Sequence, residues 1–303
     1  MVVSRAKVEP HGRDWEGELR VSGEWDGGGV SAAEPTVLAM VLTYNSPDTL
    51  AHTLQALSSQ TRLPDAVLIL DNAGTPPAET VTREWTRPSD LDVRVQREAE
   101  NSGPAGGWAR ALEEFLSSRF DLAWILDDDI IAPPESLERL LVEYQKIGTS
   151  ACVIASVRTP SGDVTHFPGW CGVLVGRDVV ASAGLPRADF FWWAEDFEYL
   201  RLRIPAAGFP VHVTPDVVVD HQWGRNQWGN PPWKYYYEAR NNVYVHLYIK
   251  HGRGRWPRKL AGLTLRAILR EDEGRLLRLK MIGRGVVDGL GGRLGRRVEP
   301  VSF

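Results

Sequence analysis

Three consecutive aspartates, Asp127, Asp128 and Asp129, follow the apolar run LAWIL at residues 122–126. Side chains alternate along a β-strand, so we expect Asp127 and Asp129 on one face and Asp128 on the other. Neighbouring carboxylates repel each other, and a hard divalent cation such as Mg²⁺ or Mn²⁺ relieves that repulsion by binding oxygen atoms of both. A solvated acidic turn is the alternative interpretation of the same three residues.

A second acidic cluster stands downstream, where Glu195 and Asp196 follow Trp192 and Trp193. These carboxylates lie among aromatic residues rather than in a polar loop, which favours a functional role. The alternative for Asp196 is a carboxylate at a helix N-terminus, where the helix dipole stabilises negative charge.

The segments between these clusters indicate how they are positioned. Apolar stretches alternate with amphipathic ones, which predicts an open, largely parallel α/β sheet covered by helices on both faces. The predicted strands are residues 36–43, 66–70, 93–95 and 122–126. Three helices are predicted: one that begins at Pro47, one at residues 106–117 and one at residues 134–147. Residues 1–35 are polar and rich in glycine, and we expect them to form an extension with one or two short strands.

Open α/β sheets bind ligands at the carboxyl ends of their strands. Asn45, Asp71 and the aspartate triplet all follow predicted strands and should meet at that edge. The glycines of residues 103–107 precede a predicted helix, where backbone N–H groups could bind an anion, although glycines also occur there for packing. The sequence has neither G-x-x-x-x-G-K-[ST] nor G-x-G-x-x-G after its first strand, which argues against an ordinary kinase, a GTPase or a nicotinamide dehydrogenase.

Composition is that of a globular protein with 43% hydrophobic and 24% charged residues. The two cysteines, Cys152 and Cys171, match no metal-ligand spacing and favour a reducing compartment. The N-terminus lacks the apolar core of a signal peptide, and no apolar run reaches the roughly 18 residues that span a membrane. We therefore expect a cytoplasmic protein.

Charge is unevenly distributed along the chain. Residues 250–297 hold 14 Lys and Arg against four Asp and Glu, a local net charge of +10. Because the whole chain has a net charge of −4, the other residues together carry −14. Between residues 258 and 280 these basic residues alternate with leucines, as in an amphipathic helix that lies on an anionic membrane surface. The alternative is that this segment packs on the acidic main domain and its leucines complete the core.

Taken together, these features resemble the family-2 glycosyltransferases of the GT-A fold over roughly residues 36–250. The motifs that carry the resemblance are Thr43-Tyr44-Asn45, Asp71-Asn72, Asn101-Ser102-Gly103-Pro104-Ala105-Gly106-Gly107, the aspartate triplet and Glu195-Asp196. Within the family, the chain is most similar to actinobacterial galactofuranosyltransferases and related rhamnosyltransferases. That similarity rests on the Asn-x-Gly-x-x-Gly-Gly loop, the aromatic residues before Glu195-Asp196-x-Glu198, and Tyr236-Tyr237-x-x-Arg240-Asn241.

The resemblance implies a GT-A domain at residues 36–250, with a mostly parallel sheet flanked by helices, and a basic helical segment at residues 251–303. It implies that Asp127 and Asp129 bind a Mn²⁺ or Mg²⁺ ion that holds the donor diphosphate. His221 would be a third metal ligand, although a histidine that satisfies a local hydrogen bond is the alternative. Asp220 is a less suitable ligand at the same place.

On the donor side, the resemblance implies that Asp71 contacts the nucleotide base. The further donor-binding residues it implies are Thr43, Asn45, Asn101, Gly106, Gly107, Asp128 and Arg240. A structural salt bridge is the alternative role for Arg240.

On the acceptor side, the resemblance implies that Asp196, with Glu195 beside it, is the general base of one inverting displacement. Crowding by Glu195 and the tryptophans should raise the pKa of that base. Tryptophan rings often pack on the apolar faces of sugars, so we expect Trp170, Trp192 and Trp193 to bind the acceptor, although each could equally belong to the core.

The sequence therefore predicts a metal-dependent transferase that uses a nucleotide-diphospho-sugar, with UDP-galactofuranose the first choice and dTDP-rhamnose the second. The acceptor would be a hydroxyl of a glycan or lipid-linked glycan, and no nucleic-acid partner is expected. A sugar nucleotidyltransferase is disfavoured because Thr43-Tyr44-Asn45-Ser46-Pro47 replaces its Gly-rich, Arg-containing loop. A non-catalytic sugar-nucleotide-binding protein is a further alternative, which the intact acidic set argues against.

Overall fold

The computed structural model describes residues 34–89, 91–166, 169–222, 231–251, 256–269 and 274–300. The chain separates into two compact units, residues 1–34 and 35–303. The short strands predicted before Pro35 lie outside the described residues.

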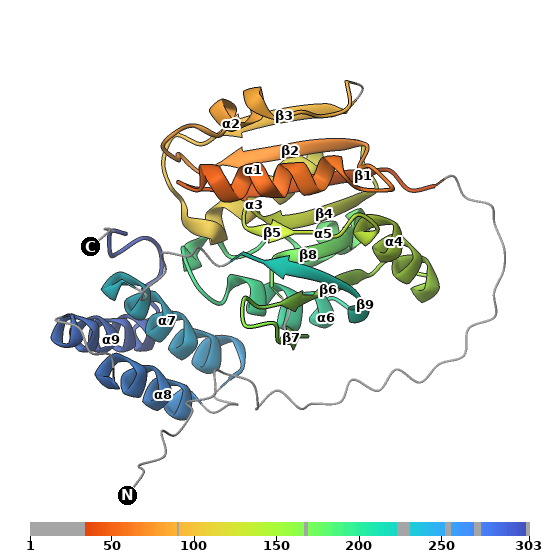
Figure 1. Ribbon diagram of the computed structural model, residues 1–303. Helices are drawn as coiled ribbons and strands as arrows, with labels where there is room; N and C mark the ends of the chain where they lie inside the picture. Colours follow the sequence, from red (N-terminus) through yellow and green to blue (C-terminus); the bar gives the residue numbers. More distant parts are fainter. Residues whose placement is uncertain are drawn as a thin grey trace, which may run out of the picture. The chain divides into compact units, whose positions relative to one another are not determined.

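One mixed sheet forms the centre of the second unit (Figure 1). Its first half is parallel, in the order β3-β2-β1-β4, and consists of β1 (Val37–Thr43), β2 (Ala66–Asp71), β3 (Asp92–Arg97) and β4 (Leu122–Asp127). Its second half adds β8 (Cys171–Gly176), β6 (Cys152–Arg158), β9 (Val211–His221) and β5 (Ile130–Ile131), with β7 (Val164–Thr165) paired to β6. The predicted α/β architecture is confirmed, and antiparallel pairs appear only after β4.

Helices cover both faces of this sheet, so its central strands have no solvent-facing side. Along β1, Val37, Ala39 and Val41 enter one hydrophobic cluster, while Leu38, Met40 and Leu42 enter another. This explains why the central strands are apolar at every position instead of at alternate ones. The covering helices are α1 (Pro47–Ser58), α2 (Ala78–Glu84), α3 (Gly103–Ser117), α4 (Ser136–Ile147) and α5 (Arg177–Ala183).

Two of these helices differ from their sequence predictions. The short helix α2 was not predicted, because its seven residues carry only one apolar side chain larger than alanine. Helix α3 begins at Gly103 rather than at Gly106, and Pro104 occupies a first-turn position where its missing N–H costs nothing.

Short irregular helices follow β8 and lead to the C-terminal helices. They are η1 (Ala188–Phe190), the π-helix η2 (Phe197–Arg203), α6 (Ile204–Ala206) and, after α7 (Pro232–Tyr244), the π-helix η3 (Val245–Ile249). The chain then forms α8 (Trp256–Leu269) and α9 (Arg275–Leu290). Figure 1 shows α7, α8 and α9 lying beside one another.

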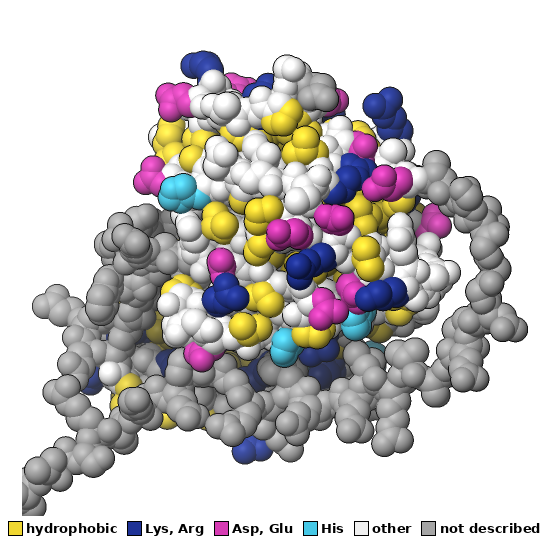
Figure 2. All heavy atoms as spheres, turned by 45° about the vertical axis from the view of Figure 1, so that its right-hand side comes forward, with side chains coloured by type: hydrophobic (Ala, Val, Ile, Leu, Met, Phe, Trp, Pro, Cys, Tyr) yellow, Lys and Arg dark blue, Asp and Glu magenta, His cyan; other side chains and the backbone are white. Residues whose placement is uncertain are grey.

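The leucines of α8 and α9 differ in burial. Leu263, together with Ala267 and Ile282, is buried against Tyr235 and Ala239 of α7, so part of this segment does complete a core. Leu265, Leu269 and Leu276, in contrast, are exposed. On the face of the molecule in Figure 2, acidic, basic and hydrophobic side chains are interspersed, which is typical of a globular surface.

Helices α7 and α9 approach each other closely at Gly285 and Gly289. A methyl group at Gly289 would lie 2.6 Å from the carbonyl oxygen of Arg240. We expect Gly289→Ala to lower the free energy of unfolding by about 1–3 kcal/mol, because it forces the two helices apart. Urea denaturation measures this change.

Gly283 of the same helix is the matched control. A methyl group there would meet no atom of the described residues within 4 Å, its own helix backbone aside. Gly283→Ala should therefore be neutral, or stabilise by up to about 1 kcal/mol through helix propensity. Equal stabilities of the two variants would contradict the packing of α7 on α9.

Candidate active site

The aspartate triplet lies where β4 ends. The strand stops at Asp127, and Asp128 and Asp129 form the turn before β5, so the argument from strand alternation is wrong for these two residues. Their contacts separate them instead. Asp128 accepts hydrogen bonds from the Thr43 hydroxyl (2.6 Å) and the Tyr44 N–H (3.3 Å) at the end of β1, whereas Asp129 lies near His221.

Asp127 is held by one side-chain and one backbone hydrogen bond. Its Oδ1 accepts a hydrogen bond from the indole N–H of Trp108 on α3 (3.3 Å), and its backbone N–H donates to the carbonyl of Trp170 (3.1 Å). The carboxylate is therefore fixed at the edge where the parallel strands end, as expected for a ligand site in an open sheet.

His221 reaches the triplet from the end of β9, which pairs with β5. The pairing places His221 opposite Ile130, and its Nδ1 lies 3.6 Å from Oδ2 of Asp129. Burial lowers the pKa of His221 to about 4, so the imidazole is neutral near pH 7, the form that binds metal ions. The adjacent Asp220 is paired with Arg158 (2.8 Å).

Glu195 and Asp196 stand at the start of η2. Asp196 is the N-cap residue of this helix, and its carboxylate accepts a hydrogen bond from the Phe197 N–H (2.6 Å). Glu195 is buried, and none of the described residues donates a hydrogen bond to its Oε2. A buried carboxylate oxygen of this kind is costly unless a proton or a ligand satisfies it.

An irregular aromatic segment, residues 190–194, leads into this pair. Phe191, Trp193 and Ala194 all have positive φ angles (61°, 77° and 71°), which residues other than glycine rarely adopt. Such conformations cost about 1–3 kcal/mol each and persist only when surrounding contacts impose them. Trp192 and Trp193 pack against each other with ring centroids 5.2 Å apart, and Trp193 is 41% exposed.

Comparison with known proteins identifies the enzyme class. Residues 39–204 match the model of glycosyl transferase family 2. The chain belongs to this family. It is 26% identical over 252 residues to the galactofuranosyltransferase GlfT1 of Mycobacterium tuberculosis, covering 69% of this chain and 82% of that protein. The corresponding protein of Mycolicibacterium smegmatis is 35% identical over 94 residues, 31% of this chain and 30% of that protein.

Solved structures show the same fold. The mannosyltransferase PcManGT from Pyrobaculum calidifontis, in complex with GDP-Man and Mn²⁺, superposes with a TM-score of 0.59 at 18% identity, covering 89% of this chain and 91% of that one. TarS residues 1–349 of S. aureus, in complex with UDP-GlcNAc, superposes with a TM-score of 0.54 at 13% identity, covering 84% and 81%. The glycosyltransferase therefore has the GT-A fold that its sequence predicts.

The structure corrects two of the predicted ligand contacts. Arg240 is fully buried, and its guanidinium donates to the carbonyls of Phe190 (2.6 Å) and Gly295 (2.5 Å), so it does not reach a phosphate. Trp170 is only 3% exposed and packs between Trp108 and Tyr199, so neither of its ring faces is open to an acceptor.

The glycine loop before α3 is also explained by packing. Methyl groups at Gly106 and Gly107 would each lie 2.5 Å from side-chain atoms, those of Ser102 and Leu42 respectively. The donors of the first helical turn are occupied, because the Gly103 N–H donates to Asn101 (2.7 Å) and the Ala105 N–H to the carbonyl of Phe191 (3.2 Å). The structure thus gives Gly106 and Gly107 a packing role, and the anion contacts predicted for Asn101, Gly106 and Gly107 stay predictions.

The remaining donor-side residues surround the β1 and β2 ends. Asp71 is buried, accepts from the backbone N–H groups of Gly74 (2.7 Å) and Ala78 (3.0 Å), and pairs with Arg97. Asn45 accepts from the Thr75 N–H (2.6 Å). With Thr43 these residues line a cleft of only about 10 Å³, so the loop after β2 is closed against β1.

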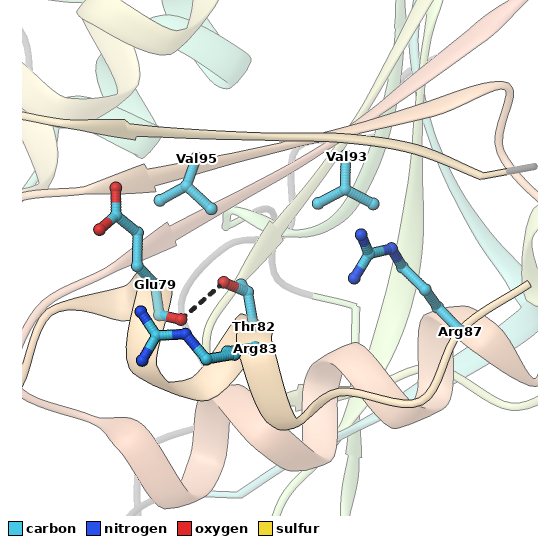
Figure 3. A pocket seen from close by; sticks show the side chains of 6 residues that line it. All are labelled: Glu79, Thr82, Arg83, Arg87, Val93 and Val95. Atoms are coloured by element: carbon cyan, nitrogen blue, oxygen red, sulfur yellow. Dashed lines mark hydrogen bonds between the residues drawn. The ribbon is translucent and has the colours of Figure 1, made fainter. Parts of the chain in front are cut away.

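A larger groove lies elsewhere, between α2 and the edge strand β3. Figure 3 shows Glu79, Thr82, Arg83 and Arg87 facing Val93 and Val95. This groove, of about 390 Å³, shares no lining residue with the acidic cluster and brings together no set of reactive groups.

Lys234, at the start of α7, is a site residue that sequence reasoning missed. Its ammonium lies 5.1 Å from the ring centre of Trp192 and 5.6 Å from that of Trp233, and its charge opposes the rise in the pKa of Asp129. The sequence signal was a lysine beside a tryptophan at a helix start, which is too common to be informative.

Burial dominates the electrostatics of the site, and repulsion between neighbouring carboxylates adds to it at Asp127, Asp129 and Glu195. Burial, followed by the charges of Asp129, Asp128, Glu195 and Asp196, raises the pKa of Asp127 well above its usual range. Burial also raises the pKa of Asp129 to about 7 and that of Asp128 to about 6. Burial and the charge of Asp196 raise the pKa of Glu195 to about 8, and burial raises that of Asp196 to about 6.

These carboxylates suit a divalent cation. Among the described residues, no three His, Cys, Asp or Glu side chains form a group that could hold a metal ion by themselves. Mg²⁺ is commonly bound by only one or two carboxylates together with the phosphates of a substrate, so a site of this type is completed by the donor. Asp127 and Asp129 are two carboxylates of the triplet that could contribute to such a site, and Nδ1 of His221 lies 3.6 Å from Oδ2 of Asp129.

We expect the free energy of unfolding in EDTA to fall as the pH rises from 6.5 to 8. In this range the folded protein retains protons on Asp129 and Glu195 that the unfolded chain has lost, so stability must decrease with pH. His221 acts in the opposite sense, but only between about pH 4 and its ordinary pKa of 6.5. The fall should be of the order of 1 kcal/mol, the value of roughly one pKa unit in one group.

Urea denaturation across this pH range measures the effect. Asp129→Asn is the matched variant, in which the free energy of unfolding should depend less on pH. Adding Mn²⁺ to the wild-type protein should restore its stability at pH 8. A wild-type stability that rises between pH 6.5 and 8 in EDTA would contradict the repulsion described here.

Proposed function

We propose that this family-2 enzyme is an inverting, divalent-metal-dependent glycosyltransferase that transfers a sugar from a nucleotide-diphospho-sugar to a hydroxyl of a glycan or lipid-linked acceptor. The supporting observation is that the triplet at the end of β4 and the Glu195-Asp196 pair before η2 lie close enough for Asp128, Asp129, Glu195 and Asp196 all to raise the pKa of Asp127. The triplet would bind the metal ion that holds the donor diphosphate, and the Glu195-Asp196 pair would accept the proton of the acceptor hydroxyl.

Glu195 and Asp196 would have different tasks. Burial raises the pKa of both carboxylates and the charge of Asp196 raises that of Glu195 further, so the pair favours one proton and one negative charge. We assign the proton to Glu195 and the role of base to Asp196. A carboxylate oxygen of Asp196 takes the acceptor proton while the acceptor oxygen bonds to the anomeric carbon. The bond from that carbon to the diphosphate breaks with its electron pair on the diphosphate, and attack from the opposite face inverts the configuration.

The diphosphate side carries the developing negative charge. A Mn²⁺ or Mg²⁺ ion bound by Asp127 and Asp129, with His221 beside them, would supply the positive charge that stabilises this leaving group. Lys234 adds a second positive charge near Asp129. The exposed Trp193 supplies a ring surface for the acceptor next to the base.

UDP-galactofuranose is the first choice of donor because GlfT1 of Mycobacterium tuberculosis, a galactofuranosyltransferase, is similar over most of its length. dTDP-rhamnose is the second choice. A sugar-nucleotide-binding protein without activity is the alternative function, and it would bind a donor but release no nucleoside diphosphate.

A donor screen tests this function. We expect release of nucleoside diphosphate from UDP-galactofuranose, in the presence of acceptor glycan and Mn²⁺, and no release in excess EDTA because the diphosphate charge is then uncompensated. The screen also includes dTDP-rhamnose, UDP-glucose, UDP-galactose and GDP-mannose. Asp129→Ala should abolish transfer, whereas Asp220→Asn, an acidic control already paired with Arg158, should retain it.

Each part of the proposal can fail separately in this screen. Full activity in excess EDTA would contradict the metal requirement. Transfer only from a hexopyranosyl UDP donor would contradict both of the favoured donors, UDP-galactofuranose and dTDP-rhamnose. Donor binding without release from any of the five donors would favour the binding protein.

Asp196→Asn should retain donor binding and lower transfer by about a hundredfold or more, the usual contribution of a general base. The amide preserves the shape of the carboxylate but cannot accept the hydroxyl proton. Steady-state kinetics compare it with Glu195→Gln, which should be milder because Glu195 is already protonated near pH 7. A larger loss in Glu195→Gln would show that Glu195 is the base.

We further propose that α8 and α9 bring the enzyme to an anionic membrane surface, where a lipid-linked acceptor would lie. No helix of the described residues is long and apolar enough to cross a membrane. Leu265, Leu269 and Leu276 are 54%, 63% and 79% exposed, and exposed basic residues flank them at Arg258, Arg266, Arg275 and Lys280. Exposed leucines beside basic residues are typical of interfacial helices.

Liposome flotation tests this contact. The protein should float with vesicles containing phosphatidylglycerol at low salt and less at high salt, because each basic residue contributes about 1 kcal/mol near an anionic surface. A variant with Leu265, Leu269 and Leu276 all changed to Ser should lose binding. Val142→Ser, at an exposed apolar position on α4, is the control that should not. Absence of flotation at low salt would leave these helices a purely structural role.

A further inference from the structure

The carbonyl groups of the aromatic segment, residues 190–194, are held from two directions. The Phe191 carbonyl accepts from the N–H of Ala105 on α3 (3.2 Å) and packs against Gly103, where any side chain would collide with it. The Ala194 carbonyl accepts from the Glu198 N–H (2.9 Å), and the carbonyls of Phe190, Trp192 and Trp193 accept from α7.

One side chain on α7, Asn241, holds three of these carbonyls. Its Nδ2 lies 3.0 Å from the oxygen of Phe190, 2.8 Å from that of Trp192 and 2.7 Å from that of Trp193. Asn241 is fully buried, so water does not compete for these contacts.

Arg240 determines which way the Asn241 amide points. Its Nε donates to Oδ1 of Asn241 (2.8 Å), which leaves Nδ2 facing the carbonyls. Arg240 also donates to the Phe190 carbonyl and to that of Gly295, so the amide is anchored to the chain beyond α9 as well.

These contacts explain how the strained backbone persists. Phe191 is the centre of a tight turn, with φ 61° and ψ −64° and a hydrogen bond from the Trp192 N–H to the Phe190 carbonyl (2.7 Å). Trp193 and Ala194 follow with positive φ, and Glu195 and Asp196 come next in the chain. Without donors at these carbonyls, the segment would relax and carry Trp193 and the acidic pair with it.

We propose that Asn241, oriented by Arg240, is a positioning residue that sets the place of Asp196 and of the Trp193 ring relative to the donor site. This inference rests on the proposed role of Asp196 as the base. Asn241 acts through backbone carbonyls and does not touch either substrate.

The test compares Asn241→Ala with Asn242→Ala, a neighbour whose amide donates only to the Glu238 carbonyl within its own helix (2.8 Å). Asn241→Ala should lower kcat for transfer about tenfold to a hundredfold, the effect of misplacing a reactive group by roughly an ångström. Its affinity for nucleoside diphosphate with Mn²⁺, measured by isothermal titration, should be unchanged. Asn242→Ala should change neither quantity.

A double-mutant cycle adds a measurement that general destabilisation would not affect. If Asn241 acts through Asp196, Asn241→Ala should cost little more once Asp196→Asn is present, so the two losses should not add. Additive losses, an unchanged kcat in folded Asn241→Ala, or a parallel loss of diphosphate affinity would each overturn the proposal.

Asn241→Ser covers the case in which the alanine variant does not fold. Its hydroxyl retains one donor, so an intermediate kcat with intact diphosphate affinity is expected, and a wild-type kcat would overturn the proposal. Failure of both variants to fold would assign Asn241 to general stability and overturn it too. A wild-type protein that transfers no sugar would refute the proposed function instead.

Discussion

The burial of five carboxylates in one site, to which their mutual repulsion adds, is the constraint on which the arrangement of this enzyme depends. Asp127, Asp128, Asp129, Glu195 and Asp196 come from two distant parts of the chain, and burial raises the pKa of each. A fold selected only for stability would separate such groups or replace them with amides. Their retention is intelligible if the charges are used, by a cation and diphosphate at one end and by an acceptor proton at the other. The sheet supplies the rigid edge at which this repulsion can be tolerated.

Holding the second acidic pair in place requires more than the sheet. The family match ends at residue 204, yet the segment that carries Glu195 and Asp196 is bound to Arg240 and Asn241 on α7, which in turn packs on α9 through Gly285 and Gly289. The C-terminal helices therefore hold the segment that carries the proposed base. This connection gives a physical reason for the fully buried Arg240, whose burial would be costly without the carbonyl partners it has.

Sequence reasoning recovered the features that depend on local periodicity. The apolar strands, the helix that begins at Pro47 and the acidic residues at strand ends were all predictable, because side-chain spacing encodes them directly. The errors at Arg240 and Trp170, and the packing role of Gly106 that the sequence did not reveal, share another cause. Each of these residue types serves equally well in a core or in a ligand site, and only the partners brought by the fold decide between the two. Lys234 escaped notice for the same reason, since its importance comes from Asp129, a residue more than a hundred positions away.

The closed loop after β2 and the acidic cluster have a common consequence for the order of substrate binding. Asp71, Asn45 and Thr43 line a cleft too small for a nucleotide base, so the loop must move when a donor enters. The carboxylates of the triplet repel one another until positive charge arrives, which makes the entry of a metal-bound diphosphate favourable where a free diphosphate would be repelled. Under the proposed mechanism, that positive charge would lower the pKa of Asp127 and, through it, weaken the repulsion between Asp127 and Asp196. Binding of the donor would then favour the ionised form of Asp196, and an acceptor that entered second would meet an ionised base.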